Sequence, residues 1–268
     1  MYPCTYLRAT SLAEAVALLN ELPEARPLSG GMTLVPTLKQ RLAAPSHLVD
    51  VTRLPELQGV ALEGKVLRIG AATRHAEVAR SPDVRTALPA LARLASLIGD
   101  QQVRNRGTLG GSVANSDPAA DYPAAVLGLA ATVVTDRRRI PADAFFVDMF
   151  QTALEPSELI VAIEFPVPRR AGYEKQPHPA SGYAVAGVFI AESASGVRVA
   201  VTGAGPCAYR WTEAEERLTQ RLNRAALDGL VAPAQGLNDD VSASSEYRAH
   251  LVGTLARRVV AALEAGTH

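Results

Sequence analysis

Two pairs of adjacent glycines, each beside small hydroxyl residues, constrain the fold of this 268-residue chain more than any other feature. The first pair lies in RPLSGGMTLVPTLKQRL (26–42) and the second in RGTLGGSVANSDPAADYP (106–123). Glycine permits positive φ and lets a ligand approach the backbone without a Cβ in the way. A Gly-Gly turn that leads into a helix can present several unpaired N–H groups to an anion. The pattern therefore predicts two anion-binding turns, which together would suit a pyrophosphate.

Hydroxyl and amide side chains flank both predicted turns: Ser29 and Thr33 around Gly30 and Gly31, and Thr108, Ser112 and Asn115 around Gly110 and Gly111. Thr33 is also placed to cap the helix that follows. The alternative is that both are ordinary tight turns, because Gly-Gly is common between elements. The chain has neither a G-x-G-x-x-G after its first strand nor a G-x-x-x-x-G-K-[ST], so the sequence supports neither a Rossmann fingerprint nor a P-loop.

Composition excludes several other classes of function. Lysine plus arginine equals aspartate plus glutamate at 27 each, which does not favour a nucleic-acid or anionic-membrane partner. No apolar stretch is long enough to span a membrane, and the start lacks a secretion signal. Two cysteines, Cys4 and Cys207, are too few for an iron–sulfur cluster, and the histidines show no metal-ligand spacing. We expect a cytoplasmic protein that does not cross a membrane and holds no metal of its own.

Helices and strands alternate along the first two thirds of the chain. Ser11 and Glu14 have the spacing of a capping box at the start of a helix. The remaining expected elements are a β-α-β unit (strands in 25–28 and 47–51, helix 33–42), a strand in 65–73, helical pieces broken at Pro82 and Pro89, a helix near 119–129, and strands in 131–135 and 158–166.

A boundary is expected near residue 168. Residues 166–182 contain four prolines and predict a linker or long loop. Beyond it, residues 183–205 predict an antiparallel hairpin with its turn at 194–196, and two amphipathic helices follow within 211–222 and 245–265. The pattern indicates an α+β body of residues 1–168 and a C-terminal lobe of residues 169–268.

Four collinear blocks carry a resemblance that covers nearly the whole chain: LSGGMTLVPTLKQRLAAPSHLVDVTRL, RNRGTLGGSVANSDPAADYPAA, ALEPSELIVAIEFP and YEKQPHPASGYAVAGVFIA. They resemble the FAD-binding medium subunits of molybdenum hydroxylases (the xanthine dehydrogenase family), and most closely those of the aerobic carbon monoxide dehydrogenase type. The resemblance implies a two-subdomain FAD-binding fold of the vanillyl-alcohol oxidase/PCMH type, with subdomains of about 1–55 and 56–168. It also implies a C-terminal carbon monoxide dehydrogenase flavoprotein-like domain with a small antiparallel sheet and helices.

The resemblance also implies which residues bind FAD. The first motif corresponds to Leu28, Ser29, Gly30, Gly31, Met32, Thr33, Leu34 and Val35, and the second to Thr108, Leu109, Gly110, Gly111 and Ser112, with Asn115 nearby. Further positions that match the family are Ile98, Asp121, Ile160, Lys175 and Tyr183. One departure is visible, because the family's first motif usually has a small residue such as alanine where this chain has Ser29. A serine still suits a phosphate site.

Each of the further positions also has an ordinary structural interpretation. Asp121 would otherwise be a carboxylate at a helix N-terminus. Ile98 and Ile160 would be core residues, Lys175 a solvated lysine instead of a residue that approaches the isoalloxazine, and Tyr183 a strand aromatic in the core instead of a cover for the flavin ring.

By resemblance, this chain is the electron outlet of a three-subunit oxidoreductase. A large molybdopterin-binding subunit would oxidise the substrate, a small subunit would carry [2Fe–2S] clusters, and this chain would pass electrons through FAD to a quinone or other acceptor. Two alternatives stay open: a stand-alone FAD-dependent oxidoreductase acting on a small molecule, and an assembly protein without cofactor. Arg104 and Arg106 are the only cations near the second turn in the sequence, and we expect them to form a solvated loop edge or a docking surface.

Overall fold

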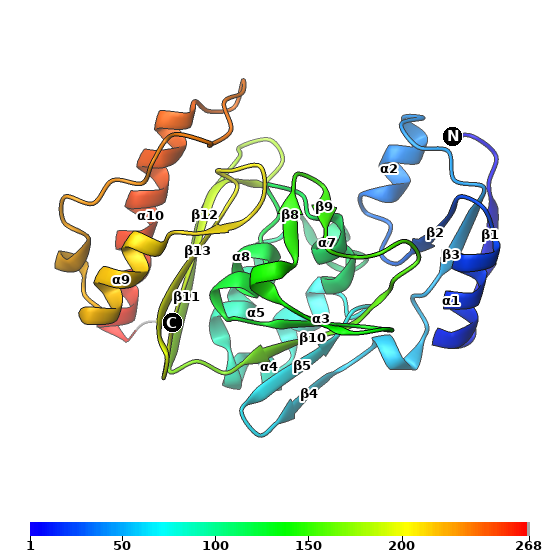
Figure 1. The fold of residues 1–268 in the computed structure, drawn as a ribbon, viewed down its shortest axis with the longest axis horizontal. Coiled ribbons are helices and arrows are strands. Elements are labelled where there is room, and N and C mark those ends of the chain that lie inside the picture. The colour runs from blue at the N-terminus through cyan, green and yellow to red at the C-terminus, as the bar shows by residue number, and fades with distance from the viewer. Residues whose placement is uncertain (267–268) are drawn as a thin grey trace.

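The computed structural model describes residues 1–266 and arranges helices and sheets in a row of layers (Figure 1). At one end of the row, a small parallel sheet has the order β1-β3-β2, with all pairs in parallel register. Its elements are β1 (Thr5–Arg8), α1 (Leu12–Glu21), β2 (Ala25–Leu28), α2 (Leu34–Lys39) and β3 (His47–Asp50). The predicted β-α-β unit is confirmed.

The caps of the first two helices differ from those predicted. Ser11 Oγ accepts from the Glu14 N–H at 3.1 Å, as predicted, but the Glu14 carboxylate accepts from the Thr10 N–H instead of closing the box on Ser11. Thr33 precedes α2 without a side-chain capping bond, so that prediction is wrong. Thr33 has helical dihedral angles, φ −101° and ψ −50°, whereas a capping side chain needs an extended backbone at this position.

The middle of the molecule is an antiparallel sheet of order β4-β5-β10-β6-β7. Its strands are β4 (Val60–Glu63), β5 (Val66–Gly70), β6 (Thr132–Thr135), β7 (Arg139–Pro141) and β10 (Ile160–Pro166). Six helices connect β5 to β6: α3 (His75–Arg80), α4 (Pro82–Ala87), α5 (Pro89–Ser96), α6 (Gln101–Arg104), α7 (Leu109–Asn115) and α8 (Tyr122–Gly128). As predicted, Pro82 and Pro89 divide the helical stretch, and each opens a new helix. Two 3₁₀ turns, Pro55–Leu57 and Ala142–Ala144, and a short hairpin of β8 (Phe146–Asp148) and β9 (Gln151–Thr152) complete this part.

The second Gly-Gly pair is not a separate turn before a helix, as the sequence predicted, but lies in the first turn of α7. Thr108 caps this helix, and its Oγ1 accepts from the Gly111 N–H at 3.2 Å. Gly110 is required here by close approach, because a Cβ at this position would lie 2.4 Å from the Cβ of Ala71. That approach lets the Gly110 N–H donate to Ala71 O at 2.8 Å, which ties α7 to the end of β5.

The proline-rich stretch predicted as a linker is largely a strand, so this prediction is wrong. β11 (Arg170–Pro177) pairs antiparallel with β12 (Ala184–Ser193) from Arg170 opposite Glu192 onward. The prolines are tolerated because Pro166 and Pro177 lie at strand ends and Pro168 and Pro179 lie outside the strands; Pro177 falls where the register shifts. The predicted hairpin of β12 and β13 (Gly196–Thr202) is confirmed, and β14 (Tyr209–Arg210) completes the sheet. The final helices are a 3₁₀ turn (Arg224–Leu227), α9 (Thr212–Gln220) and α10 (Ser245–Ala265).

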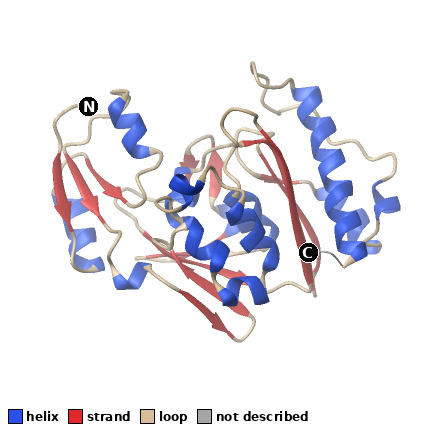
Figure 2. Ribbon diagram, turned by 180° about the vertical axis from the view of Figure 1, so that it is seen from behind, coloured by secondary structure: helices blue, strands red, loops and turns tan. Residues whose placement is uncertain are grey.

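The sheet of β11 to β14 is buried on both faces. Helices α9 and α10 cover one face, while α5 and α8 cover the other (Figures 1 and 2). Successive residues of β12 therefore enter different cores: Val188 and Ile190 pack toward α10, and Phe189 packs with Tyr173 and the middle of the molecule. Burial on both faces explains why β12 reads as an unbroken apolar run. No helix within residues 1–266 is long and apolar enough to cross a membrane.

Candidate functional site: a cavity between the two glycine motifs

A cavity of about 660 Å³ lies where the small parallel sheet meets the middle of the molecule. The loop after β2, the start of α7, the segment before α8 and the loop before β10 all line it, and residues 180–183 close one side. Its lining combines apolar residues and glycines with polar side chains that include Arg26, Asp117 and Asp121. Both the volume and this lining are typical of cofactor sites in proteins.

The fold brings the two glycine motifs into direct contact. Ser29 Oγ and Thr108 Oγ1 form a hydrogen bond of 2.9 Å, although they lie far apart in the sequence. Thr108 is buried, and the same hydroxyl caps α7, so this bond fixes the loop after β2 against the start of that helix. The hydroxyls that flank the glycines thus join the two motifs into one wall of the cavity.

Only the first motif has backbone amides to offer a ligand. The N–H groups of residues 30–33 make no hydrogen bond within the described part of the chain. Gly31 holds a positive φ of 71°, which turns the chain between β2 and α2. In the second motif, by contrast, the amides are already used: they donate to Thr73 O, Ala71 O, Thr108 Oγ1 and Thr108 O. The prediction of two equivalent amide nests is therefore wrong for the second motif, which supports the wall and does not donate from its backbone.

A buried ion pair lies beside the cavity. Asp121 lines the cavity at the start of α8, and Lys175 Nζ approaches its carboxylate to 3.0 Å. The Tyr173 hydroxyl donates to the same carboxylate. Burial raises the pKa of Asp121, and the charge of Lys175 opposes that rise. Lys175 is only 5% exposed, so the interpretation as a solvated lysine is wrong.

Lys175 also holds the segment that closes the cavity. Its ammonium group donates to Leu97 O at 3.0 Å and to Gly182 O at 2.9 Å in addition to Asp121. One side chain thereby connects the end of α5, the start of α8 and the loop between β11 and β12. Tyr183 belongs to that loop and is 45% exposed, so the interpretation as a core aromatic is wrong. It lies at the edge of the cavity instead.

Most of the residues predicted from the sequence line this one cavity: Leu28, Ser29, Gly30, Gly31, Met32, Thr33, Leu34, Ile98, Thr108, Gly110, Gly111, Ser112, Asn115, Asp121, Ile160 and Tyr183. Three do not. Leu109 is fully buried in the core, and Val35 lines a neighbouring smaller cavity. Lys175 does not line the cavity itself but donates hydrogen bonds to two residues that do, Asp121 and Gly182. The structure thus brings together segments that the sequence separates by more than a hundred residues.

The loop before β10 contributes residues that sequence reasoning missed. Leu154, Glu158 and Leu159 line the cavity beside Ile160. The Glu158 carboxylate is inaccessible to solvent and accepts from Thr135 Oγ1 at 2.7 Å and from the guanidinium of Arg138 at 2.9 Å. These bonds hold the pKa of Glu158 at about 2, and the bond with Arg138 contributes most. All three residues lie in the block ALEPSELIVAIEFP, which carries part of the resemblance, but nothing in that block singles them out.

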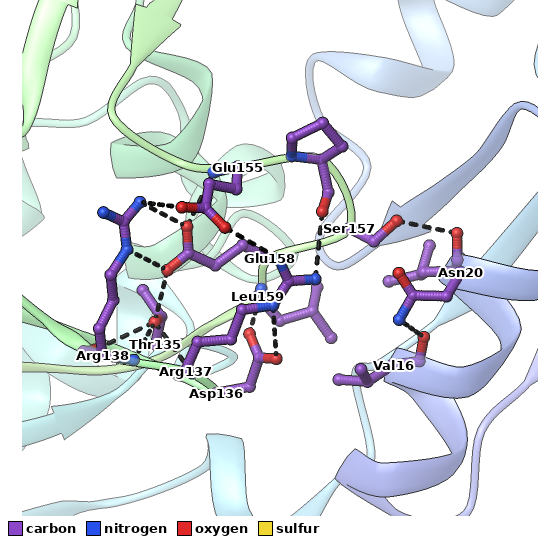
Figure 3. A network of polar contacts seen from close by, with 12 residues as sticks. Val16, Asn20, Thr135, Asp136, Arg137, Arg138, Glu155, Ser157, Glu158 and Leu159 are labelled. Carbon is purple, nitrogen blue, oxygen red and sulfur yellow. Dashed lines mark hydrogen bonds and ion pairs between the residues drawn. The ribbon is translucent and has the colours of Figure 1, made fainter.

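A polar network anchors this loop to its neighbours on both sides (Figure 3). Asp136 accepts from the Leu159 N–H at 2.7 Å, and Arg137 donates to Pro156 O at 3.1 Å. On the other side, Ser157 Oγ donates to Leu19 O at 2.9 Å, which links the loop to α1 of the small parallel sheet. The network therefore fixes the spacing between the two units that enclose the cavity.

His75 is another residue that sequence reasoning did not place in the site. It lines the cavity at the start of α3, is 4% exposed, and its Nδ1 has no hydrogen-bond partner among the described residues. Its ring stacks at a tilt on Tyr122, with centroids 5.3 Å apart. Burial, and secondarily the charge of Arg104, lower the pKa of His75 to about 4. No spacing in the sequence distinguishes this histidine from a surface residue.

Neutral burial of His75 predicts a specific loss of stability in weak acid. Its pKa is about 4 when folded and near 6.5 when unfolded, so the unfolded state binds the extra proton as pH falls through this window. We expect the free energy of unfolding to fall by about 2 kcal/mol between about pH 7.5 and pH 5 on account of this residue. Urea denaturation of the wild type and His75→Gln at both values measures it. An equal decrease in the two proteins would contradict the assignment.

Of the two arginines beside the second motif, Arg104 does not form the expected solvated edge. Its guanidinium donates to Ile98 O at 3.0 Å and to Gly99 O at 2.9 Å, and so holds the backbone beside the cavity. Arg106 lines the smaller neighbouring cavity.

The chain is similar to known proteins along nearly its whole length. Residues 2–168 match the family model described as "FAD binding domain in molybdopterin dehydrogenase". The carbon monoxide dehydrogenase medium chain of Hydrogenophaga pseudoflava is 37% identical over 95% of both chains. The glyceraldehyde dehydrogenase medium chain of Sulfolobus acidocaldarius is 34% identical over 92% of both. Among solved structures, reconstituted CO dehydrogenase from Oligotropha carboxidovorans superposes with a TM-score of 0.90 and 34% identity over 98% of both chains.

Proposed function

Since this chain belongs to the family of FAD-binding domains in molybdopterin dehydrogenases, we propose that it is the electron outlet of a three-subunit oxidoreductase. In this proposal, electrons from [2Fe–2S] clusters of a small subunit leave through FAD to a quinone or other acceptor. FAD, when bound, can accept electrons singly and release them in pairs, which is chemistry that no side chain supplies. The row of unbonded amides in residues 30–33, on the wall of a cofactor-sized cavity, is the observation that carries the assignment.

The residues of the first motif suit the pyrophosphate. Amide N–H groups in a turn with positive φ bind anions without a cationic side chain, and no lysine or arginine occurs between Leu28 and Val35. The hydroxyls of Thr33 and Ser112 also line the cavity and can donate to phosphate or ribose oxygens. In this proposal the second motif supports the cavity wall, because its backbone amides are already bonded. Thr108 positions Ser29 through the hydrogen bond between their hydroxyls.

A second group of residues that line the cavity suits the isoalloxazine. Asp121 presents a carboxylate to the cavity, and Ile98 and Tyr183 present apolar and aromatic surface. Lys175 opposes the rise in the pKa of Asp121 that burial causes, and it fixes the loop of residues 180–183. In this proposal Lys175 is a positioning residue that acts through these two partners.

The proposal includes partners, a location and a division into domains. A large molybdopterin-binding subunit and a small [2Fe–2S] subunit would assemble with this chain in the cytoplasm, where its two free cysteines would stay reduced. We assign residues 1–168 to the FAD-binding PCMH-type domain, with subdomains of about 1–55 and 56–168, and residues 169–268 to the C-terminal domain. The change from the middle sheet to the sheet of β11 to β14 supports this boundary. The large subunit would select the substrate.

Two measurements test the proposal. Purified chain should bind one FAD per molecule in a titration followed by flavin absorbance. In the complex purified through a tag on this chain, removing FAD should abolish reduction of a quinone analogue but leave reduction of the iron–sulfur clusters by substrate intact. Carbon monoxide, glyceraldehyde and nicotine, the compounds in the relatives' names, are the first substrates to try. Unchanged quinone reduction by the flavin-free complex would contradict the electron route, and substrate oxidation by the chain alone would favour the stand-alone alternative.

A further inference from the structure

A second cavity, of about 340 Å³, lies behind the first glycine motif. Residues 28–31, Ala72 and Thr108 line both cavities, so the glycine loop and its bond to Thr108 form the wall between them. The rest of the second cavity comes from β1, the end of β3 and the segments around residues 53, 74 and 106. Neither the proposed FAD site nor its mechanism uses these residues.

Its charge is strongly one-sided. Four arginines line this cavity, Arg8, Arg53, Arg74 and Arg106, and Asp50 is the only carboxylate among the lining residues. The chain as a whole has a formal net charge of zero, so this concentration of positive charge is local. The arginines come from four separate segments, and only the tertiary structure brings them together.

Asp50 cannot serve as the counter-ion for all of them. One of its carboxylate oxygens accepts from the N–H and hydroxyl of Thr52, at 2.8 and 2.6 Å, and the other accepts from the Tyr6 hydroxyl. Arg8 lies 3.5 Å from Asp50. Although burial opposes it, these hydrogen bonds and the charge of Arg8 keep the pKa of Asp50 below its ordinary value, so the carboxylate is charged but fully engaged.

The other three guanidiniums have no acidic partner. Within residues 1–266, Arg53, Arg74 and Arg106 form no ion pair. Guanidinium groups offer planar, bidentate donors that match carboxylate and phosphate oxygens. The guanidiniums of these three arginines therefore have no anionic partner, within the described residues, that accepts such paired hydrogen bonds.

We propose that this cavity is an anion-binding site for a small compound with two or more carboxylate or phosphate groups. Its volume lies at the lower end of the range for ligand pockets, which suits a compound smaller than a dinucleotide. Arg53, Arg74 and Arg106 bind the anionic groups, while Arg8 and Asp50 hold the shape of one side. Because the site shares its wall with the first cavity, its occupancy is expected to change FAD affinity, and FAD to change anion affinity by the same factor.

Calorimetric titration of the FAD-loaded, full-length chain with inorganic pyrophosphate, and separately with citrate, tests the site at constant ionic strength. We expect saturable binding of one anion per chain. The double variant Arg53→Ala/Arg74→Ala and the single variant Arg106→Ala should each weaken it by at least about tenfold, as expected for the loss of charged hydrogen bonds. Arg80→Ala is the matched control, because Arg80 is exposed and lines neither cavity. Flavin absorbance shows separately that FAD remains bound in every variant.

Three results would overturn the proposal. Absence of saturable binding of either probe at millimolar concentration would do so, and so would equal weakening by Arg80→Ala, which would indicate nonspecific attraction to net charge. Binding by the chain alone but not by the complex with its partner subunits would mean that an acidic segment of a partner fills the cavity, which excludes a small-molecule site.

Discussion

Gly31→Val is expected to reduce the flavin content of the purified protein to less than about a tenth of the wild-type value while the protein stays folded. Gly31 holds φ at 71° between β2 and α2, and a β-branched residue there is strained by about 1–3 kcal/mol. A Cβ would also lie 3.1 Å from Val35 and 3.2 Å from Leu28. Relief of that strain must move the amides of residues 30–33, which are the proposed pyrophosphate donors. Flavin absorbance per chain measures the result.

Gly64→Val is the matched control for this substitution. Gly64 has a similar φ of 63°, has nothing within 4 Å of the position of a Cβ, and lies in the hairpin turn between β4 and β5, away from the cavity. It should lose comparable stability but keep its flavin. Normal flavin content in Gly31→Val, or equal loss in Gly64→Val, would show that the loop after β2 does not hold the cofactor.

Lys175→Met is expected to lower the free energy of unfolding of the flavin-free protein by about 3–5 kcal/mol, because it leaves the Asp121 carboxylate buried without its counter-ion. It also frees Leu97 O and Gly182 O from their bonds to the ammonium group. Asp121 can recover part of this loss by binding a proton, since burial already raises its pKa. Its folded pKa would then lie above the unfolded one, so the loss should be smaller at pH 6 than at pH 8. Urea denaturation at the two pH values measures both effects.

Two further variants separate a buried charge from a missing side chain. Adding Asp121→Asn to Lys175→Met removes the unpaired charge and keeps an acceptor for Tyr173, so the double variant should regain part of the stability and lose the pH dependence. Arg93→Ala breaks the exposed pair with Glu174, 2.6 Å apart, and should cost less than about 1 kcal/mol. A double variant no more stable than Lys175→Met would mean that the lost contacts, and not the charge, dominate.

Local signals in the sequence predicted much of the fold correctly. Pro82 and Pro89 marked helix starts because proline fits the first helical position, and the β12–β13 hairpin followed from two apolar runs around a short turn. The linker prediction for residues 166–182 failed because it used local signals alone. Prolines do suggest a loop, but Pro166 and Pro177 end β10 and β11, the other two lie outside these strands, and pairing with β12 overrode the local preference.

The two glycine motifs with their hydroxyl neighbours, and the resemblance to FAD-binding subunits, could be recognised without a structure, because they are properties of contiguous residues. The sequence could not decide which amides remain free. Those of residues 30–33 do, and those of the second motif do not, because Ala71 and Thr73 accept from them across a contact between β5 and α7. The Ser29–Thr108 bond, the burial of Lys175 against Asp121 and the four arginines behind the glycine loop are likewise products of packing between distant segments. Hydrogen bonding and burial depend on which segments meet in space, and only the tertiary structure decides that.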